Sequence, residues 1–224
     1  MNSSTSQPTS RPTFQPTSQP TSHLPSFVLE EFLKDAKEFG ALYLSKVRSS
    51  QIAFNPAFVF HMVQDEMKEL EDAKDEAERV DAVLDATYYI LDHLGKFAFE
   101  ETVQVLRVSR TGKAQMECNN LESFAWFVEE SIRSQSKWNT DTEWSDSVKL
   151  LVDLAEKFVG GLYELGVDPV PVWKLIHQAN MTKFGPGGYC REDGKWVKPP
   201  NFTPPDDLIR KEIARQRSGQ AIDH

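Results

Sequence analysis

The chain has 224 residues, and its 25 Lys and Arg against 34 Asp and Glu give a formal net charge of −9. This acidic balance argues against a nucleic-acid partner, because a protein that clamps a phosphate backbone needs basic patches. No apolar run approaches the roughly 18 residues of a membrane-spanning helix, so we expect no membrane partner. The two cysteines, Cys118 and Cys190, are too few for a disulfide framework and favour a reducing compartment.

Residues 1–26 are rich in Ser, Thr, Pro and Gln, and they contain the motif QPTS three times. Such a segment has too few apolar side chains to offset the entropy lost on ordering, so we expect a disordered tail. Its acid-poor, Ser/Thr-rich composition is also typical of organellar transit peptides. We therefore expect a cytoplasmic protein, with import into an organelle as the alternative.

From residue 27 onward, apolar residues recur three and four positions apart, which is the period of an amphipathic α-helix. No segment shows the period of two that is typical of a strand. The prolines after residue 188 are expected to exclude regular structure there. The expected helices cover 27–48, 56 to the low seventies, 77–94 ending at Gly95, pieces near 100–108 and 121–135, 145–165, and 169 to the GPGG at 185–188.

The sequence thus predicts an all-α fold, an antiparallel helical bundle with an extended Pro-rich C-terminal segment. We assign residues 27–206 to one domain, in which 96–144 is an insertion or a divergent helical pair. Residues 207–224 are expected to form a helical or disordered tail. The aromatic residues of the helical segments are expected in the core, and one of them is a candidate to stack on a base: Phe58, Phe60, Tyr88 and Trp173.

One acidic residue stands inside an apolar helical face of the segment 56–76. At 100° per residue, Glu66 lies between Val59 and Ala73, and Glu69 lies on the margin of that face. An isolated buried carboxylate is costly, so Glu66 must be paired, protonated or bound to a metal ion. For Glu66 considered by itself, an ion pair or a partly exposed position at the edge of the apolar face explains the sequence equally well.

The next helical segment repeats this feature, because Asp81, Asp85 and Asp92 follow the edge of its apolar face. Among nearby bases, only Lys74 and Arg79 lie within reach by sequence. Two helices that present carboxylates with few bases indicate a hard divalent cation, Mg²⁺ or alternatively Mn²⁺. The chain must then reverse near 71–79, because one straight helix would separate Glu66 from Asp85 by about 28 Å.

The motifs DEMKE at 65–69 and DAVLDATYY at 81–89 resemble the all-α nucleoside triphosphate pyrophosphohydrolases, the MazG and phosphoribosyl-ATP pyrophosphohydrolase superfamily. That family carries EExxE on one helix and ExxD on the next. Asp85 matches the Asp of ExxD, but the Glu three residues before it is replaced here by Ala82, with Asp81 one position earlier. Residues 173–206 resemble the C-terminal extension of the phosphoribosyl-ATP pyrophosphohydrolase-like branch.

The resemblance implies a hydrolase that binds Mg²⁺ and splits a nucleoside triphosphate into a monophosphate and pyrophosphate. It also implies a homodimer or higher homo-oligomer. The implied metal ligands are Glu66, Glu69, Asp81 and Asp85, and Asp65 and Glu66 are the candidates for accepting the proton of the attacking water. The implied contacts to substrate phosphates or nucleotide are Asn180, Lys183, Lys195 and Lys198.

Several interpretations stay open at the level of sequence. The same chemistry on phosphoribosyl-ATP is the nearest alternative. A catalytically inactive nucleotide-binding protein and a helical interaction module, whose acids only face solvent, are the others. From spacing alone, Asn180 and Lys183 are also compatible with a solvated helix end.

Overall fold

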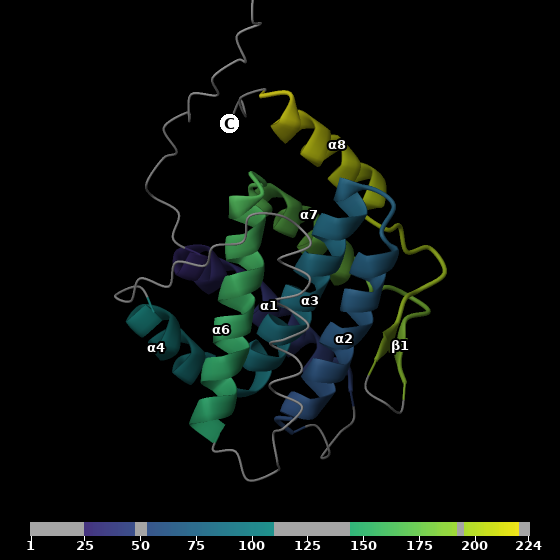
Figure 1. Ribbon diagram of the computed structural model, residues 1–224. Helices are drawn as coiled ribbons and strands as arrows, with labels where there is room; N and C mark the ends of the chain where they lie inside the picture. The colour runs from purple at the N-terminus through teal and green to yellow at the C-terminus, as the bar shows by residue number, and fades with distance from the viewer. Residues whose placement is uncertain (1–24, 48–52, 110–143, 192–194, 220–224) are drawn as a thin grey trace, which may run out of the picture.

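In a computed structural model, residues 25–47, 53–109, 144–191 and 195–219 are described, and they are mostly helical (Figure 1). The all-α prediction is therefore confirmed. The helix expected near 121–135 and most of the 1–26 tail lie outside the described residues. The helices are α1 (Pro25–Lys46), α2 (Pro56–Asp72), α3 (Glu76–Phe97), α4 (Phe99–Ser109), α6 (Trp144–Glu164), α7 (Pro169–Thr182) and α8 (Asp206–Arg217).

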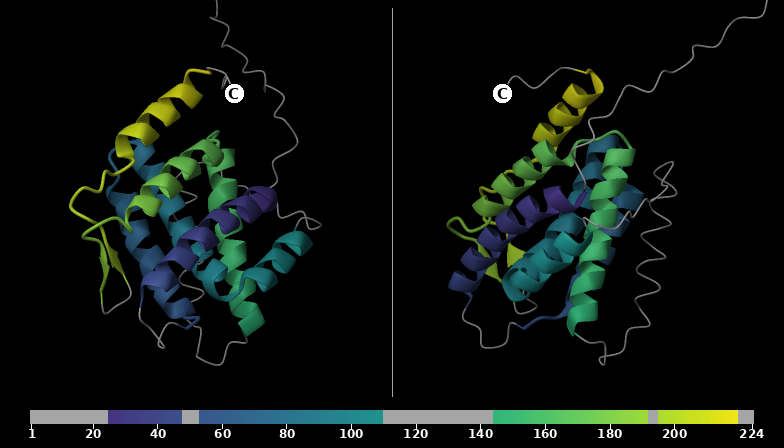
Figure 2. Two further views of the ribbon diagram at one scale, coloured as in Figure 1. Left: turned by 180° about the vertical axis from the view of Figure 1, so that it is seen from behind. Right: turned by 90° about the vertical axis from the view of Figure 1, so that its left-hand side faces the viewer.

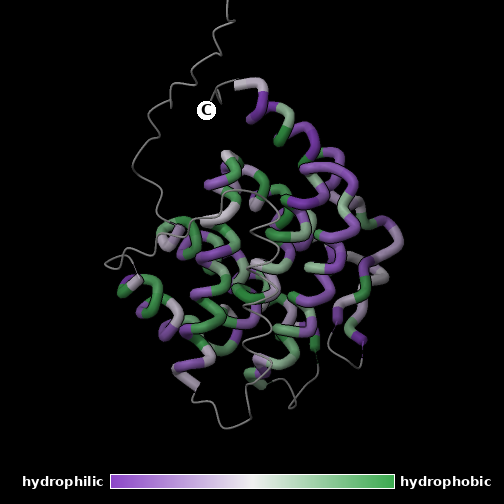
Figure 3. Tube along the Cα trace, in the orientation of Figure 1, coloured by the Kyte–Doolittle hydropathy of each residue, from purple (hydrophilic) through white to green (hydrophobic). Residues whose placement is uncertain are grey.

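Helix α3 is the centre of the molecule. It contacts α1, α2, α4, α6, α7 and α8 (Figures 1 and 2). Most of its residues after Val80 are buried, on every side of the helix, as expected for a helix without a solvent face. In Figure 3 hydrophobic positions gather among the central helices, whereas α8 is mostly hydrophilic. No helix in the described ranges is both long and apolar enough to cross a membrane.

Helices α2 and α3 form the antiparallel pair that the sequence interpretation required. The chain leaves α2 at Ala73 in an extended conformation, with φ −61° and ψ 129°. The Asp75 carboxylate then caps α3 by accepting from the Glu78 amide at 2.9 Å, and the Glu78 carboxylate accepts from the Lys74 amide at 2.8 Å. These two hydrogen bonds on either side of the helix start fix it without Gly or Pro.

The predicted end of α3 at Gly95 is wrong, because the helix continues to Phe97. Gly95 serves a different purpose, since α1 crosses α3 at this point. A Cβ atom at Gly95 would lie 3.1 Å from the backbone N and Cα of Lys37. Absence of a side chain at Gly95 therefore permits close packing of the two helices.

The segment after α7 contains more regular structure than its prolines suggested. Strands β1 (Tyr189–Cys190) and β2 (Trp196–Val197) pair antiparallel, and α8 begins directly after Pro205. The expectation of no regular structure is wrong here because the prolines flank these elements and do not interrupt them. The Trp196 indole donates to the Lys183 carbonyl at 2.7 Å, which fastens β2 to the end of α7.

We predict that Gly95→Ala destabilises the protein, because the added methyl group must push the α1 backbone away. Overpacking of this kind typically costs about 1–3 kcal/mol. Thermal unfolding should show a lower melting temperature. The matched control is Gly160→Ala in α6, where the nearest contact of an added Cβ is 3.7 Å from Pro25. Its melting temperature should be unchanged or higher, because Ala favours helix; equal effects of both changes would contradict the packing role of Gly95.

Candidate functional site

Glu66 of α2 is a buried carboxylate, with 6% of its surface exposed. Within the described part of the chain it makes no hydrogen bond or ion pair, and its surroundings are electrostatically unfavourable. Burial raises the pKa of Glu66 to about 8, and the nearby charges of Asp85 and Glu69 add to this effect. Ionised Glu66 is thus destabilising unless a cation compensates it.

Asp81 and Asp85 of α3 lie close to Glu66, across the α2–α3 hairpin. Both are only partly accessible to solvent, and burial raises the pKa of each carboxyl group. The charge of Asp85 raises the pKa of Asp81 further. The Oδ1 atom of Asp81 is fully enclosed and has no hydrogen-bond partner among the described residues. The hairpin therefore gathers carboxylates that burial and mutual repulsion both disfavour.

The other two acidic candidates lie differently. Glu69 is exposed at the margin, yet its charge still acts on Glu66 and Asp81. Asp65 lies on the outer side of α2, with its carboxylate 3.3 Å from Lys68 Nζ and 4.0 Å from His61 Nε2. The charges of Glu66, Glu69, Asp81 and Asp85 thus influence one another, whereas Asp65 contacts residues of its own helix.

Three lysines from the C-terminal part of the chain converge on these carboxylates. Burial lowers the pKa of Lys183, whereas the charge of Asp85 opposes that shift. Lys183 and Lys198 act most strongly among the cations on Asp85, and Lys195 acts on Glu66. The sequence interpretation placed these lysines at substrate phosphates, and the structure places them beside the acidic group.

A cavity rich in aromatic side chains adjoins this charged group. Asp85, Asn180, Lys183 and Lys195 belong to its lining. Asn180 is buried and hydrogen-bonds to Tyr88, whose hydroxyl is also 3.0 Å from His177 Nδ1. The remaining lining consists of Phe39, Tyr43, Phe58, Met62, Tyr88, Tyr89, Asp92, Lys96 and Trp196.

Sequence reasoning missed several features of this cavity. Phe58 was expected in the core, but it lines the cavity, whereas Trp173 is buried and stacks on Phe32 at 4.1 Å as a core residue does. Asp92 was grouped with Asp81 and Asp85, but its Oδ2 pairs with Lys96 Nζ at 2.6 Å. The four-residue spacing of Asp92 and Lys96 was the signal that could have shown this pair.

A larger and more open depression lies between the end of α1 and residues 184–191. Its lining includes Lys46, Arg191 and the glycine-rich turn that follows α7. None of the site residues expected from the sequence lines it. We therefore place the candidate site at the smaller cavity and the acidic group beside it.

The donor set of the acidic group suits a hard divalent cation. Among the described residues, no three His, Cys, Asp or Glu side chains form a ready-made metal-binding group. Mg²⁺, however, is commonly held by one or two carboxylates and takes its other ligands from water and substrate phosphates. Glu66 and Asp85, which offer only oxygen donors, are of the type that Mg²⁺ or Mn²⁺ prefers.

Comparison of the chain with protein-family models, curated proteins and solved structures found no match. The class of protein is therefore defined by the fold and the site themselves. The chain is an all-α protein in which a helical hairpin presents buried carboxylates to a group of lysines and an aromatic cavity.

We predict that the metal-free protein loses stability as the pH rises from about 5 to 8. Unfolded Glu66 ionises near its ordinary pKa of 4.5, whereas folded Glu66 keeps its proton up to about 8. The folded state thus binds more protons in this window, so the free energy of unfolding falls as the pH rises, by ~1.4 kcal/mol per unit of pKa difference at most. Below pH 4.5 Glu66 is protonated in both the folded and the unfolded state, so its contribution to the free energy of unfolding no longer changes with pH.

This pH dependence is tested by measuring melting temperatures at pH 5, 6.5 and 8 in the presence of a metal chelator. Glu66→Gln should melt higher than the wild type at pH 8 and should differ less from it at pH 5. Glu71→Gln, an exposed acid of the same helix, is the control and should follow the wild type at each pH. A Glu66→Gln curve parallel to that of the wild type would show that Glu66 is not protonated in the folded state.

Proposed function

We propose that this protein is a Mg²⁺-dependent nucleoside triphosphate pyrophosphohydrolase. It would cleave the bond between the α- and β-phosphates and release a nucleoside monophosphate and pyrophosphate. The observation that carries the proposal is the convergence of Glu66, Asp81 and Asp85 from two helices, with lysines beside them. The resemblance of segments 65–69, 81–89 and 173–206 to that superfamily supports the same reaction.

Glu66, Glu69, Asp81 and Asp85 are the residues that would hold the cation. When bound, Mg²⁺ would neutralise phosphate charge and lower the pKa of the attacking water. The carboxylates would then be ionised, because a nearby cation lowers their pKa values and offsets their burial. The repulsion within the acidic group would thus be exchanged for attraction to the ion.

The lysines and the cavity supply the two halves of a nucleotide site. Lys183, Lys195 and Lys198 would neutralise the triphosphate as point charges. The adjoining aromatic cavity would take the base, since aromatic rings offer it apolar stacking surface. Asn180, which lies in the cavity beside Lys183, would contact the base or the sugar. A triphosphate bound this way would lie with its charged end against α3.

The reaction requires water to attack the α-phosphorus. A bond forms between the water oxygen and that phosphorus, and the bond from the phosphorus to the bridging oxygen of the β-phosphate breaks. Glu66 is the better candidate to accept the water's proton, because it faces the lysines and Asp85, whereas Asp65 lies outside beside Lys68. The carboxylates and lysines fix the reactants in place, and positioning supplies much of the rate enhancement.

Release of pyrophosphate from a panel of canonical and modified nucleoside triphosphates, with phosphoribosyl-ATP included, tests the proposal. We expect Mg²⁺-dependent turnover of at least one of them. Glu69→Gln and Asp85→Asn should each reduce kcat by about 100-fold or more while leaving helical content intact, because each removes a charge from the cation site. Circular dichroism checks the fold.

Glu71→Gln is the matched control, because Glu71 is an exposed acid two positions from Glu69 on the same helix. Its turnover should equal that of the wild type. Turnover of Asp85→Asn near the wild-type value would exclude the assigned cation site. Nucleotide binding without turnover would indicate an inactive nucleotide-binding protein, and absence of both Mg²⁺ and nucleotide binding in calorimetry would indicate a helical interaction module.

A further inference from the structure

An ion pair of α3 forms part of the wall of the aromatic cavity. Asp92 Oδ2 lies 2.6 Å from Lys96 Nζ, and only 12% and 10% of the two side chains are exposed. Both residues line the cavity together with Tyr43, whose ring centroid lies 4.4 Å from Lys96 Nζ. Two opposite charges are therefore held among aromatic rings, away from bulk water.

Stability does not account for a pair in this position. Removal of two charges from water is costly, and apolar residues of similar volume often replace such a pair without loss of stability. The fold nevertheless makes room for it. Gly40 of α1 lies opposite, and a Cβ atom there would be 3.0 Å from Asp92 Oδ1. A few polar groups set among apolar side chains are typical of a ligand site.

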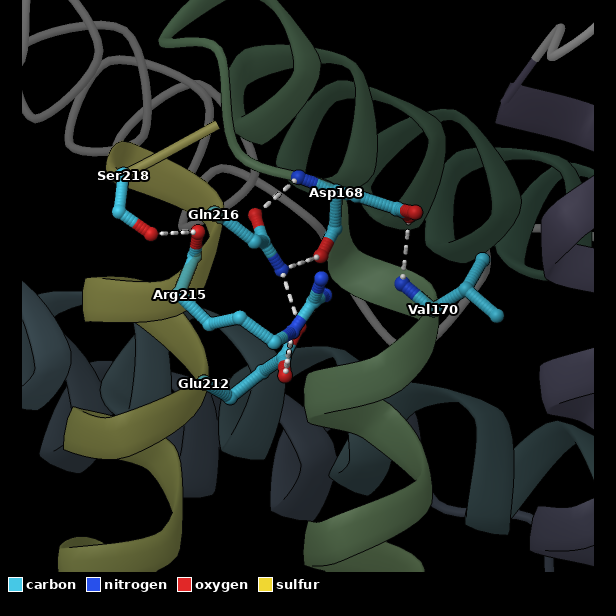
Figure 4. A network of polar contacts seen from close by, with 6 residues as sticks. All are labelled: Asp168, Val170, Glu212, Arg215, Gln216 and Ser218. Carbon is cyan, nitrogen blue, oxygen red and sulfur yellow. Dashed lines mark hydrogen bonds and ion pairs between the residues drawn. The ribbon is translucent and has the colours of Figure 1, made fainter. Parts of the chain in front are cut away.

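The protein uses only one of the two carboxylate oxygens of Asp92. Asp92 Oδ1 is enclosed and has no hydrogen-bond partner among the described residues. The ion pair of Glu212 in α8 is different (Figure 4), because both oxygens of Glu212 accept hydrogen bonds, at 2.6 to 2.9 Å, from Arg215 and Gln216. An acceptor left unpaired inside a protein is unfavourable. Asp92 thus has one acceptor position available to a ligand.

Asp92 lies at a suitable distance from the acidic group. It follows Asp85 by seven residues in α3, which places the two on the same side of the helix and about 10 Å apart along its axis. This distance is comparable with the length of a nucleoside and its α-phosphate. Asp85 and Lys183 line the same cavity. A nucleotide with its phosphates beside these two residues would bring the far edge of its base to Asp92.

The chemistry of a carboxylate determines which base would fit there. In an ion pair the carboxylate is ionised and offers only acceptors, so the ligand group beside Asp92 Oδ1 must donate a hydrogen bond. Rotation about χ2, which is broad in aspartate, would turn this oxygen toward the cavity. An exocyclic amino group would then donate to it. A ring carbonyl at the same place would set one acceptor against another and would be disfavoured.

We propose that Asp92 is a specificity-determining residue, which selects nucleotides whose base carries an exocyclic amino group, such as cytosine or adenine. Lys96 holds the carboxylate of Asp92 in place through the ion pair and is a positioning residue. This inference rests on the proposed function and adds to it the class of base that the cavity accepts.

Two matched pairs of nucleotides test the inference: CTP against UTP, and ATP against inosine triphosphate. The members of each pair differ chiefly in an amino group or a carbonyl at one ring position. We expect kcat/KM for pyrophosphate release to favour the amino member of at least one pair by about 10- to 100-fold, as for a hydrogen bond to a charged group. Equal values within both pairs, or preference for the carbonyl members, would overturn the inference and leave the proposed function standing.

Asp92→Asn should reduce this preference to less than about threefold, because an amide both donates and accepts. The matched control is Glu212→Gln, which removes the acid of a similarly buried ion pair outside the cavity lining and should keep the wild-type ratio. A ratio of two substrates on one variant does not depend on how much of the variant is folded. An unchanged ratio in Asp92→Asn would show that Asp92 does not contact the base.

A double variant, Asp92→Leu with Lys96→Met, removes the charges but keeps the volume, so it should remain folded and should lose the preference as well. Calorimetry with α,β-methylene analogues of the four nucleotides measures the same preference in Kd without turnover. Preferential binding of the amino members by a protein that hydrolyses none of the nucleotides would support the inference and refute the proposed function. Absence of binding to all four would refute both.

Discussion

The structure depends on apolar packing that holds like charges close together. Helices α2 and α3 pack through buried aliphatic residues, and this packing keeps Glu66 facing Asp81 and Asp85 although their charges repel. Hydrophobic contacts are non-directional and collectively large, so they can tolerate a few unfavourable electrostatic neighbours. Under the proposed function, a bound cation would relieve this electrostatic cost.

The lysines of the candidate site come from the C-terminal part of the chain, between residues 183 and 198. Lys183 directly follows α7, and Lys195 and Lys198 flank β2. The β1–β2 pair and the ion pairs of Arg210 bring these residues over the α2–α3 hairpin. One half of the site therefore consists of the α2–α3 hairpin. The other half consists of the C-terminal segment after α7, which contacts the helices at several points. Such a division suits a ligand with a phosphate chain, which needs charges on more than one side.

Much of the fold was predictable because helix formation leaves local signals. The apolar period of three and four located α2 and α3, and Asn55-Pro56 marked the start of α2. The reversal between them was inferred only from the need to join Glu66 with Asp85, yet a local signal was present in the Asp75 and Glu78 capping pair. Gly95 misled the prediction because glycine serves both as a helix end and as a point of close helix approach, and sequence shows no difference between the two.

The sequence by itself determined that Glu66 lies within an apolar face and that acids gather at two helix edges, because a helical period fixes which residues share a side. Only the tertiary structure decided which acids meet. Asp65 and Glu66 are adjacent in sequence, but one points outward to Lys68 and the other inward to Asp85. Lys183 and Lys198 approach Asp85 from far along the chain. The physical reason is that burial and charge proximity depend on how helices pack, whereas sequence periodicity describes one helix at a time.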